Sequence, residues 1–271
     1  MLAPLKPFFR GDWAQYGESL QLMDTQCTQP SVAQWLSNSA QLEAALSRHA
    51  QTLNGAHVRK AVASDWQLRY LTALLPPVVA LLSLLRYRVP TSSHDMALTL
   101  NESGAPAQFA ITQLGTTMPD AAPVTRYDAL VWRHLEPLIA HLARQTKVPA
   151  KILWGNARRS LLGIFDQALS LIGANAALSA PLIEDRRLLL ESPLWPDRRR
   201  NPLFLRHRQV SVRHESGEHL LTLHASCCLA YQLPRTGHCG ACPLAPKHRK
   251  RARNDLPDAT AALMRRDLIV G

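Results

Sequence analysis

The stretch YLTALLPPVVALLSLL, residues 70–85, is the most apolar run in the chain, and the rest of the fold must be arranged around it. Its 16 residues are fewer than the roughly 20 that a helix needs to cross a bilayer. We therefore expect a buried core helix. Pro76 and Pro77 each lack a backbone N–H, so we expect a kink or a restart of the helix there. Arginines flank the run on both sides, which makes a shallow contact with a membrane surface the alternative.

Composition places this helix in a globular protein. Of the 271 residues, 46% are hydrophobic and 19% are charged, which supplies a core and excludes a disordered chain. The 12 glycines exclude a collagen-like repeat, and the 5 cysteines are too sparse for a disulfide scaffold. The N-terminus carries neither an apolar run of signal-peptide length nor a small-residue cleavage site. We therefore expect a cytoplasmic protein.

Apolar periodicity predicts more helices than strands. Alternating residues predict two hairpins, one over 96–112 and one from Leu203–Val212 to Leu220–His224. Helical spacing and start signals predict helices over 31–53 with Ser31 as N-cap, over 64–86 from Ser64-Asp65, over 126–146 with Pro137 at a bend or start, over 149–173 and over 181–190.

From these elements we expect an α+β protein that is mainly α. We assign residues 1–197 to a helical domain with a small β-hairpin and residues 198–246 to a small C-terminal module. Residues 247–271 form a basic tail, with a short helix expected from Pro257 to Leu268.

Positive charge gathers in the C-terminal quarter. Residues 198–271 hold 14 Lys and Arg against 5 Asp and Glu, so they carry +9 of the chain's net charge of +11. Such a region attracts an anionic chelate, an acidic protein or a nucleic acid. We interpret the run from Lys247 to Arg251 as a solvated tail, with a docking site for an acidic electron donor as the alternative.

Four of the five cysteines form the strongest motif. Cys227 and Cys228 are adjacent, ten residues follow, and Cys239 and Cys242 are separated by two more. Under reducing conditions, clustered thiols more often hold a metal than form disulfides. Structural zinc sites usually have two C-x-x-C-like pairs, whereas adjacent cysteines that point apart suit a wider object with two metals. The spacing therefore favours a [2Fe–2S] cluster and leaves zinc or a disulfide pair open.

The Cys-Cys-x10-Cys-x2-Cys motif near the C-terminus resembles that of the FhuF-type ferric-siderophore reductases. The resemblance implies a [2Fe–2S] cluster bound by these four cysteines and one-electron transfer to ferric iron in a siderophore, often of hydroxamate type, with release of ferrous iron. The chain departs from the family in the 29 residues that follow Cys242. The segments that also agree with the family are Asn201-Pro202-Leu203, Tyr231, Leu233-Pro234, Gly240, Leu75-Pro76-Pro77 and Ile152–Asn156.

Other residues are candidates for tuning the cluster. Reduction adds a negative charge, so a positive charge nearby raises the reduction potential. Arg235, His238 and the run Arg198–Arg200 are such candidates, with an exposed and screened side chain as the alternative for each.

The family's relation to siderophore synthetases implies a chelate-binding cleft in the helical domain. Its candidate lining is Trp154, Asn156, Arg158 and Arg159, with helix packing and a solvated arginine pair as the alternative.

The expected partners are a ferric siderophore and an electron donor such as a ferredoxin or a flavin/NAD(P)H reductase. We expect no nucleic acid, and at most a peripheral contact with the cytoplasmic face of the inner membrane.

Two other functions stay open: an iron- or redox-sensing [2Fe–2S] protein, and a basic four-cysteine zinc module that binds nucleic acid. Few aromatic residues near the tail argue against the second. A siderophore biosynthetic enzyme would need a nucleotide site, and the sequence has no Gly-rich phosphate loop. Cys27, far from the motif, is expected to be an inert thiol.

Overall fold

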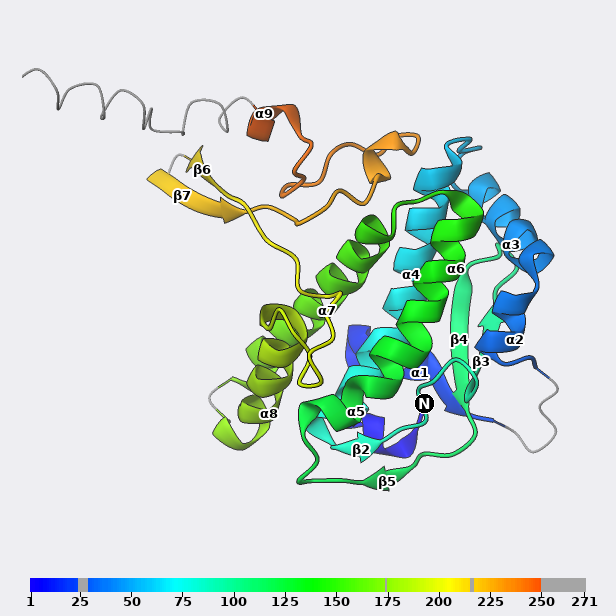
Figure 1. Ribbon diagram of the computed structural model, residues 1–271, viewed down its shortest axis with the longest axis vertical. Helices are drawn as coiled ribbons and strands as arrows, with labels where there is room; N and C mark the ends of the chain where they lie inside the picture. The colour runs from blue at the N-terminus through cyan, green and yellow to red at the C-terminus, as the bar shows by residue number, and fades with distance from the viewer. Residues whose placement is uncertain (24–28, 174, 215–216, 250–271) are drawn as a thin grey trace, which may run out of the picture.

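The computed structural model describes residues 1–23, 29–173, 175–214 and 217–249, and it is mainly helical with three small sheets in that part of the chain (Figure 1). The predicted α+β class is therefore confirmed. Cys27 and the tail helix expected from Pro257 to Leu268 lie outside the described residues.

Short 3-10 and π turns are labelled η. The elements are η1 Ala3–Leu5, η2 Gly11–Trp13, α1 Ala14–Glu18, β1 Leu20–Leu22, α2 Val32–Ser37, α3 Ser39–Thr52, α4 Arg59–Val79, η3 Ala80–Leu84, β2 Tyr87–Arg88, β3 Met96–Leu100, β4 Pro106–Ile111, β5 Thr116–Thr117, α5 Pro123–Leu130, η4 Val131–Leu135, α6 Glu136–Thr146, α7 Ala150–Ile172, α8 Ala176–Arg186, η5 Arg187–Glu191, β6 Gln209–His214, β7 Gly217–Thr222, η6 Ala230–Gln232 and α9 Pro246–Arg249.

Helix α4 is the centre of the fold and lies between strand β4 and helix α7 in Figure 1. Its start at Ser64-Asp65 was predicted wrongly, because the helix begins at Arg59 and Ser64 is buried within it. The segment Arg59–Leu84 is long and apolar enough to cross a membrane. However, 67% of its apolar 18-residue window is buried inside the protein. The expected core helix is thus what the structure contains.

Pro76 and Pro77 do not end α4, which continues through both and widens into the π turn Ala80–Leu84. The ring of Pro77 leaves the Ala73 carbonyl without its usual helical donor. The Ser19 hydroxyl donates to that carbonyl at 2.6 Å and satisfies it. The expected restart is therefore absent, because the N-terminal segment supplies the donor that proline lacks.

The predicted hairpin over 96–112 is confirmed as the antiparallel pair β3–β4. Strand β1, which the sequence did not indicate, adds to it in parallel, giving the order β1-β4-β3. Phe109 of β4 meets the ring of Tyr70 of α4 edge to face, with centroids 4.9 Å apart. Aromatic packing thus fixes α4 on the sheet.

The remaining helices follow the predicted order with shifted ends. The segment expected as one helix over 31–53 divides at Asn38, which caps α3, while Ser31 caps α2 as predicted. Pro137 lies in the first turn of α6, but the backbone at Leu135 before it is already helical, so Pro137 follows the π turn Val131–Leu135 within a continuous helical segment instead of starting a helix. The helix predicted over 181–190 begins earlier, at Ala176.

The second hairpin is confirmed as β6–β7, although β6 begins at Gln209 instead of Leu203. Leu203 is buried in the same core as the helices, and so is Leu233 from the loop beyond the hairpin. The division into domains at residues 197 and 246 stays a prediction.

A buried histidine lies where α4, η4 and the chain before β3 meet. His134 places Nδ1 at 2.9 Å from the Thr91 carbonyl and Nε2 at 2.5 Å from the Tyr70 hydroxyl. Its side chain is inaccessible to solvent. Burial lowers the pKa of His134 to about 4, although the bond to Thr91 acts in the opposite direction.

We expect His134 to weaken the fold in mild acid. The unfolded chain takes up a proton at the ordinary pKa of 6.5, whereas folded His134 stays neutral until about pH 4. The stability contributed by the neutral ring is therefore full above pH 6.5 and is lost as the pH falls towards 4, amounting to about 2 kcal/mol by about pH 5. Urea unfolding at about pH 7.5 and about pH 5 measures this loss. The His134→Gln variant should be less stable at the higher pH but should lose less between the two; equal losses would contradict the assignment.

Candidate functional site

The four cysteines lie in the loops that follow β7, across one end of the helical body (Figure 1). Cys227, Cys228 and Cys242 are buried, and Cys239 is exposed. The sulfur atoms of Cys227 and Cys242 are 3.6 Å apart. Although Cys239 is exposed as a residue, partial burial of its thiol raises the pKa of that thiol, and the nearby thiols of Cys242 and Cys228 raise it further. The adjacent pair and the C-x-x-C pair therefore meet in space.

Backbone hydrogen bonds explain why the adjacent cysteine pair and the C-x-x-C pair meet. The His224 N–H donates to the Ala241 carbonyl at 2.9 Å, which ties the exit of β7 to the second pair. The Cys242 N–H donates to the Cys239 carbonyl at 3.1 Å and closes a tight turn. Leu229 adopts a left-handed φ of 66°, so the chain reverses directly after Cys228.

The donor set fits two metals better than one. A tetrahedral ion with metal–sulfur bonds of about 2.3 Å holds its sulfurs about 3.8 Å apart, close to the Cys227–Cys242 separation. Among the described residues, no three His, Cys, Asp or Glu side chains lie close enough together to hold a single metal ion. A single zinc with four thiolates would require such convergence. The structure gives one close pair, Cys227 and Cys242, which leaves Cys228 and Cys239 as ligands for a second iron.

The environment of the thiols also suits a metal. Burial raises the pKa of Cys227 to about 12, and the neighbouring thiols of Cys242 and Cys228 contribute to this rise. Such a thiol stays protonated until a cation replaces its proton. The Leu229 N–H donates to the Cys227 sulfur at 3.3 Å and is placed to stabilise the thiolate.

A buried relay of polar side chains holds this module on the helices. Asn156 of α7 donates from Nδ2 to the Ser64 hydroxyl at 2.9 Å, and Ser64 donates to the Cys228 carbonyl at 2.7 Å. Gln67 accepts from the same Asn156 amide at 3.0 Å. All three side chains are fully buried. The relay therefore fixes the backbone at Cys228; the sequence indicated Ser64 only as a helix start and did not indicate Gln67.

Arg159 of α7 supplies positive charge at the module. Its Nη2 donates to the Ser226 carbonyl at 3.0 Å, next to Cys227. Its guanidinium opposes the rise in the pKa of Cys239, so the charge reaches that thiol. Gly155, one turn earlier, lies so close that a Cβ there would come within 1.9 Å of the Ser226 hydroxyl oxygen.

The structure separates the four residues proposed to line a chelate site. Asn156 belongs to the relay, and Trp154 packs partly buried against the core. Arg158 is buried and donates to the carbonyls of Leu190 at 2.5 Å and Leu203 at 3.2 Å. Arg159 lines a large pocket on the side of α7 that faces the N-terminal segment. A substrate-binding role for these residues stays a prediction, and the pocket makes Arg159 the strongest candidate.

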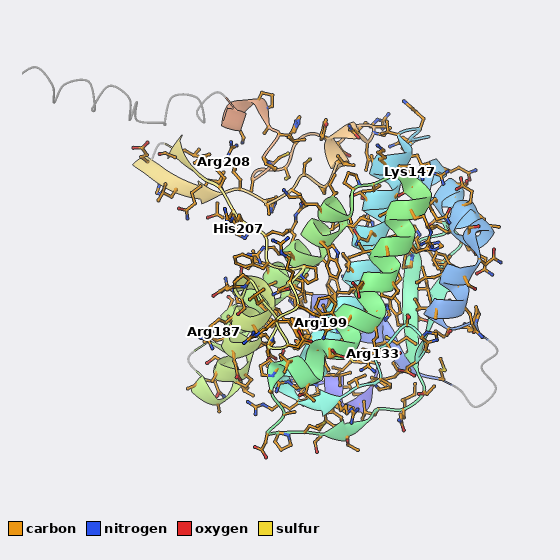
Figure 2. All side chains as sticks on the ribbon, viewed as in Figure 1. Arg133, Lys147, Arg187, Arg199, His207 and Arg208 are labelled. Carbon is orange, nitrogen blue, oxygen red and sulfur yellow. The ribbon has the colours of Figure 1, made fainter. Side chains whose placement is uncertain are left out.

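The residues proposed to tune the cluster lie in different places. Arg235 and His238 are both exposed, and His238 stacks on Tyr231 with ring centroids 4.4 Å apart. Arg199 lies over the ring of Trp132, 4.2 Å from its centroid, and pairs with aspartates of the helical body. Figure 2 shows Arg199 near Arg133, well away from the module. The tuning roles of Arg235, His238 and the run Arg198–Arg200 stay predictions.

Comparison with known families agrees with this geometry. The chain matches the family model described as "Ferric iron reductase FhuF-like transporter" over residues 64–217, more than half of its 271 residues. Residues 225–244, which contain all four cysteines, match the model described as "FhuF 2Fe-2S C-terminal domain". No curated protein matches the chain. The cofactor of the module is a [2Fe–2S] cluster, as predicted.

We expect Gly155→Ala to disturb the docking of the module, because the new methyl group would overlap the Ser226 hydroxyl. Gly163→Ala on the same helix is the matched control, since a Cβ there meets nothing within 4 Å and alanine favours helix by about 1 kcal/mol. Iron and acid-labile sulfide per chain, together with the thermal midpoint, should fall for Gly155→Ala only.

Combining Gly155→Ala with Ser226→Ala should restore part of the loss, because it removes the atom at 1.9 Å and leaves the Ser226 Cβ at 3.2 Å. Unchanged cluster content in Gly155→Ala would show that this contact does not position the module.

We expect Arg159→Gln to lower the reduction potential of the cluster. The reduced form is the more negative one, so a neighbouring positive charge stabilises it. Arg159→Lys keeps the charge and should shift the potential less. Arg133→Gln removes an exposed arginine of the helical body and should leave the potential unchanged. Protein-film voltammetry measures all three variants; equal potentials for Arg159→Gln and the wild type would contradict the role of Arg159.

Proposed function

The chain belongs to the family of FhuF-like ferric iron reductases, and on that premise we propose that it reduces ferric iron held in a siderophore, of hydroxamate type. Its general activity as a ferric iron reductase with a [2Fe–2S] cluster follows from the two family matches. The proposal adds the form in which iron arrives, the residues that hold the cluster, and the compartment.

The observation that carries the proposal is the meeting of the two cysteine pairs beside Arg159. We propose that Cys227 and Cys242 hold one iron, supported by the 3.6 Å between their sulfurs, and that Cys228 and Cys239 hold the other. Three of the four are buried and Cys239 is exposed, so an iron held by Cys239 would be the one nearer solvent. Electron exchange with an outside molecule is therefore expected on that side.

The reaction needs no general base and no nucleophile. When bound, a [2Fe–2S] cluster supplies one electron at a time. Ferric iron is a hard ion held tightly by charged oxygen ligands, and one added electron makes it ferrous iron, which those ligands hold less well. The siderophore keeps its own bonds, and the iron leaves without cleavage of the chelator.

The chain's own residues do the positioning. The buried relay from Asn156 through Ser64 fixes the backbone at Cys228. Arg159 faces Cys239 and offers its positive charge to an oxygen-rich anionic chelate as well as to the reduced state. A reductant must return one electron per turnover. We propose an acidic ferredoxin or a flavin/NAD(P)H reductase for this role, on the net charge of +9 in residues 198–271.

We propose that this takes place in the cytoplasm, where imported chelates would meet cellular reductants. Support comes from the thiol-rich module, which suits reducing conditions. The apolar segment Arg59–Leu84 is mostly inside the core, so a contact with the inner membrane would be peripheral.

We expect each of Cys227→Ser, Cys228→Ser, Cys239→Ser and Cys242→Ser to lose the cluster or change its EPR spectrum, because each removes one soft ligand. Cys27→Ser is the matched control and should retain the iron, the sulfide and the spectrum. For activity, the dithionite-reduced wild type is mixed anaerobically with a ferric trihydroxamate and a ferrous trap. It should release about one ferrous ion per cluster.

Two outcomes would count against the proposal. Full cluster retention in any of the four variants would remove that residue from the ligand set. A cluster that re-oxidises without a ferrous signal would mean that the trihydroxamate is not a substrate.

A further inference from the structure

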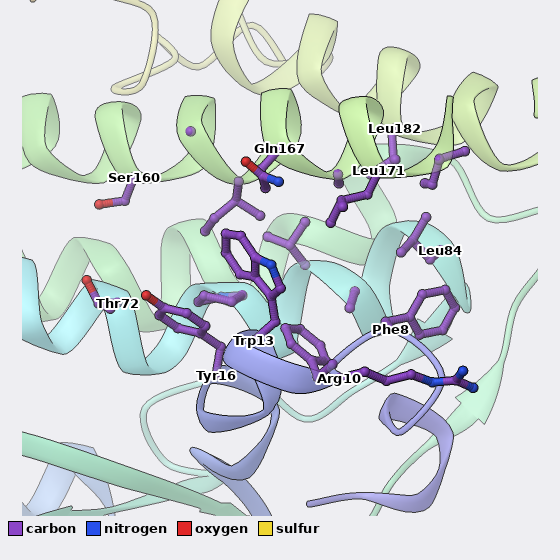
Figure 3. A pocket seen from close by; sticks show the side chains of 18 of the residues that line it. Phe8, Arg10, Trp13, Tyr16, Thr72, Leu84, Ser160, Gln167, Leu171 and Leu182 are labelled. Carbon is purple, nitrogen blue, oxygen red and sulfur yellow. The ribbon is translucent and has the colours of Figure 1, made fainter. Parts of the chain in front are cut away.

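A large pocket lies between the N-terminal segment, α4 and α7. Its volume is about 790 Å³, within the range of sites for drug-sized ligands. Figure 3 shows Trp13 rising from the N-terminal segment towards Gln167 of α7, and Leu84 lying further along the pocket near Phe8. Trp13 is 41% exposed and Leu171 is 62% exposed, although both are apolar. An open, mostly apolar cavity of this size marks a place where an organic molecule binds.

The polar groups of the pocket determine which charge of ligand it favours. Arg10 and Arg159 contribute positive charge, and no Asp or Glu occurs among the lining residues whose side chains the structure describes. Ser160 and Gln167 of α7 add neutral polar groups (Figure 3). This lining favours a neutral or anionic molecule with acceptor oxygens and an apolar body, and it disfavours a cationic one.

Arg159 joins this pocket to the cysteine module. One of its nitrogens, Nη2, donates to the Ser226 carbonyl beside Cys227, while its Nε is buried and has no hydrogen-bond partner among the described residues. Because Nε is inaccessible, a ligand in the pocket would meet the guanidinium through its other nitrogens. The same side chain thus reaches the thiols on one side and the pocket on the other.

We propose that this pocket binds the ferric chelate through an apolar arm of its organic scaffold, with the oxygen-coordinated iron at the Arg159 end. The proposal rests on the proposed function and adds a binding site and a substrate class to it: siderophores that carry an acyl chain or another apolar arm. Trp13, Leu171 and the apolar residues of α4 enclose the arm, and Arg159 contacts the negatively charged oxygens around the iron.

The pocket can be filled without disturbing the fold. Gly163 lies in the wall formed by α7, and a Cβ built there meets nothing within 4 Å. Gly163→Leu therefore occupies the pocket and also favours the helix. Ala44→Leu on α3 adds the same side chain at an exposed helical position that does not line the pocket, and it is the matched control.

The experiment separates binding from reduction by using gallium(III), which has the charge of ferric iron but takes up no electron here. Cluster-loaded protein is titrated by calorimetry with the gallium(III) complex of a linear trihydroxamate and with that of the same trihydroxamate acylated by an eight-carbon chain. The acylated complex should bind at least about tenfold more tightly to the wild type and to Ala44→Leu, because several CH2 groups leave water. Gly163→Leu should abolish that advantage, and Arg159→Gln should weaken both complexes.

Each outcome bears on the proposal separately from the function. Equal affinity for the two complexes, or unchanged binding to Gly163→Leu, would overturn the pocket assignment even if ferric trihydroxamate is reduced at the normal rate. Tight binding without ferrous release would support the pocket assignment and overturn the proposed function. A second experiment tests lipid binding with vesicles of phosphatidylethanolamine and phosphatidylglycerol. If they sediment the wild type but not Gly163→Leu while the gallium complexes do not distinguish the two proteins, the pocket binds lipid, and the proposal is wrong.

Discussion

The hydrogen bond from Ser64 to the Cys228 carbonyl is the contact on which the rest of the site depends. It joins residues 164 positions apart, and Asn156 completes it from a second helix. A buried polar group of this kind is costly unless it is paired, so the three side chains hold the module in one position relative to α4 and α7. The distance from the module to Arg159 and to the pocket depends on that position.

The same central helix connects the module to the N-terminal segment. Proline within α4 leaves a carbonyl free, and Ser19 satisfies it, which keeps the first residues of the chain packed along the helix. Trp13 and Tyr16 of this segment form one wall of the pocket, while α7 forms the opposite wall. The missing backbone hydrogen bond at Pro77, which would normally weaken a helix, is thus part of how the pocket is built.

Electrostatics near the thiols come from a few placed groups more than from overall charge. The arginine-rich run before the module includes Arg199, which stacks on Trp132 and pairs with aspartates of the helical body. Arg159 of α7, outside that run, is the arginine whose charge acts on the Cys239 thiol. Charges beyond about 10 Å are screened by salt, so proximity outweighs number. Net charge remains relevant to attracting partners from a distance.

Local sequence was sufficient for the features that depend on short spacing. The cysteine motif indicated the cofactor, helical periodicity indicated α7, and Ser31 and the β3–β4 hairpin were found from cap and alternation signals. The tertiary structure alone decided that Ser64 is a buried donor instead of a helix cap, that β1 joins the sheet, and that Arg159 is the residue between the pocket and the thiols. The reason is physical: serine has the same propensity for a cap wherever it occurs, whereas burial against a partner 164 residues away arises only when the chain packs.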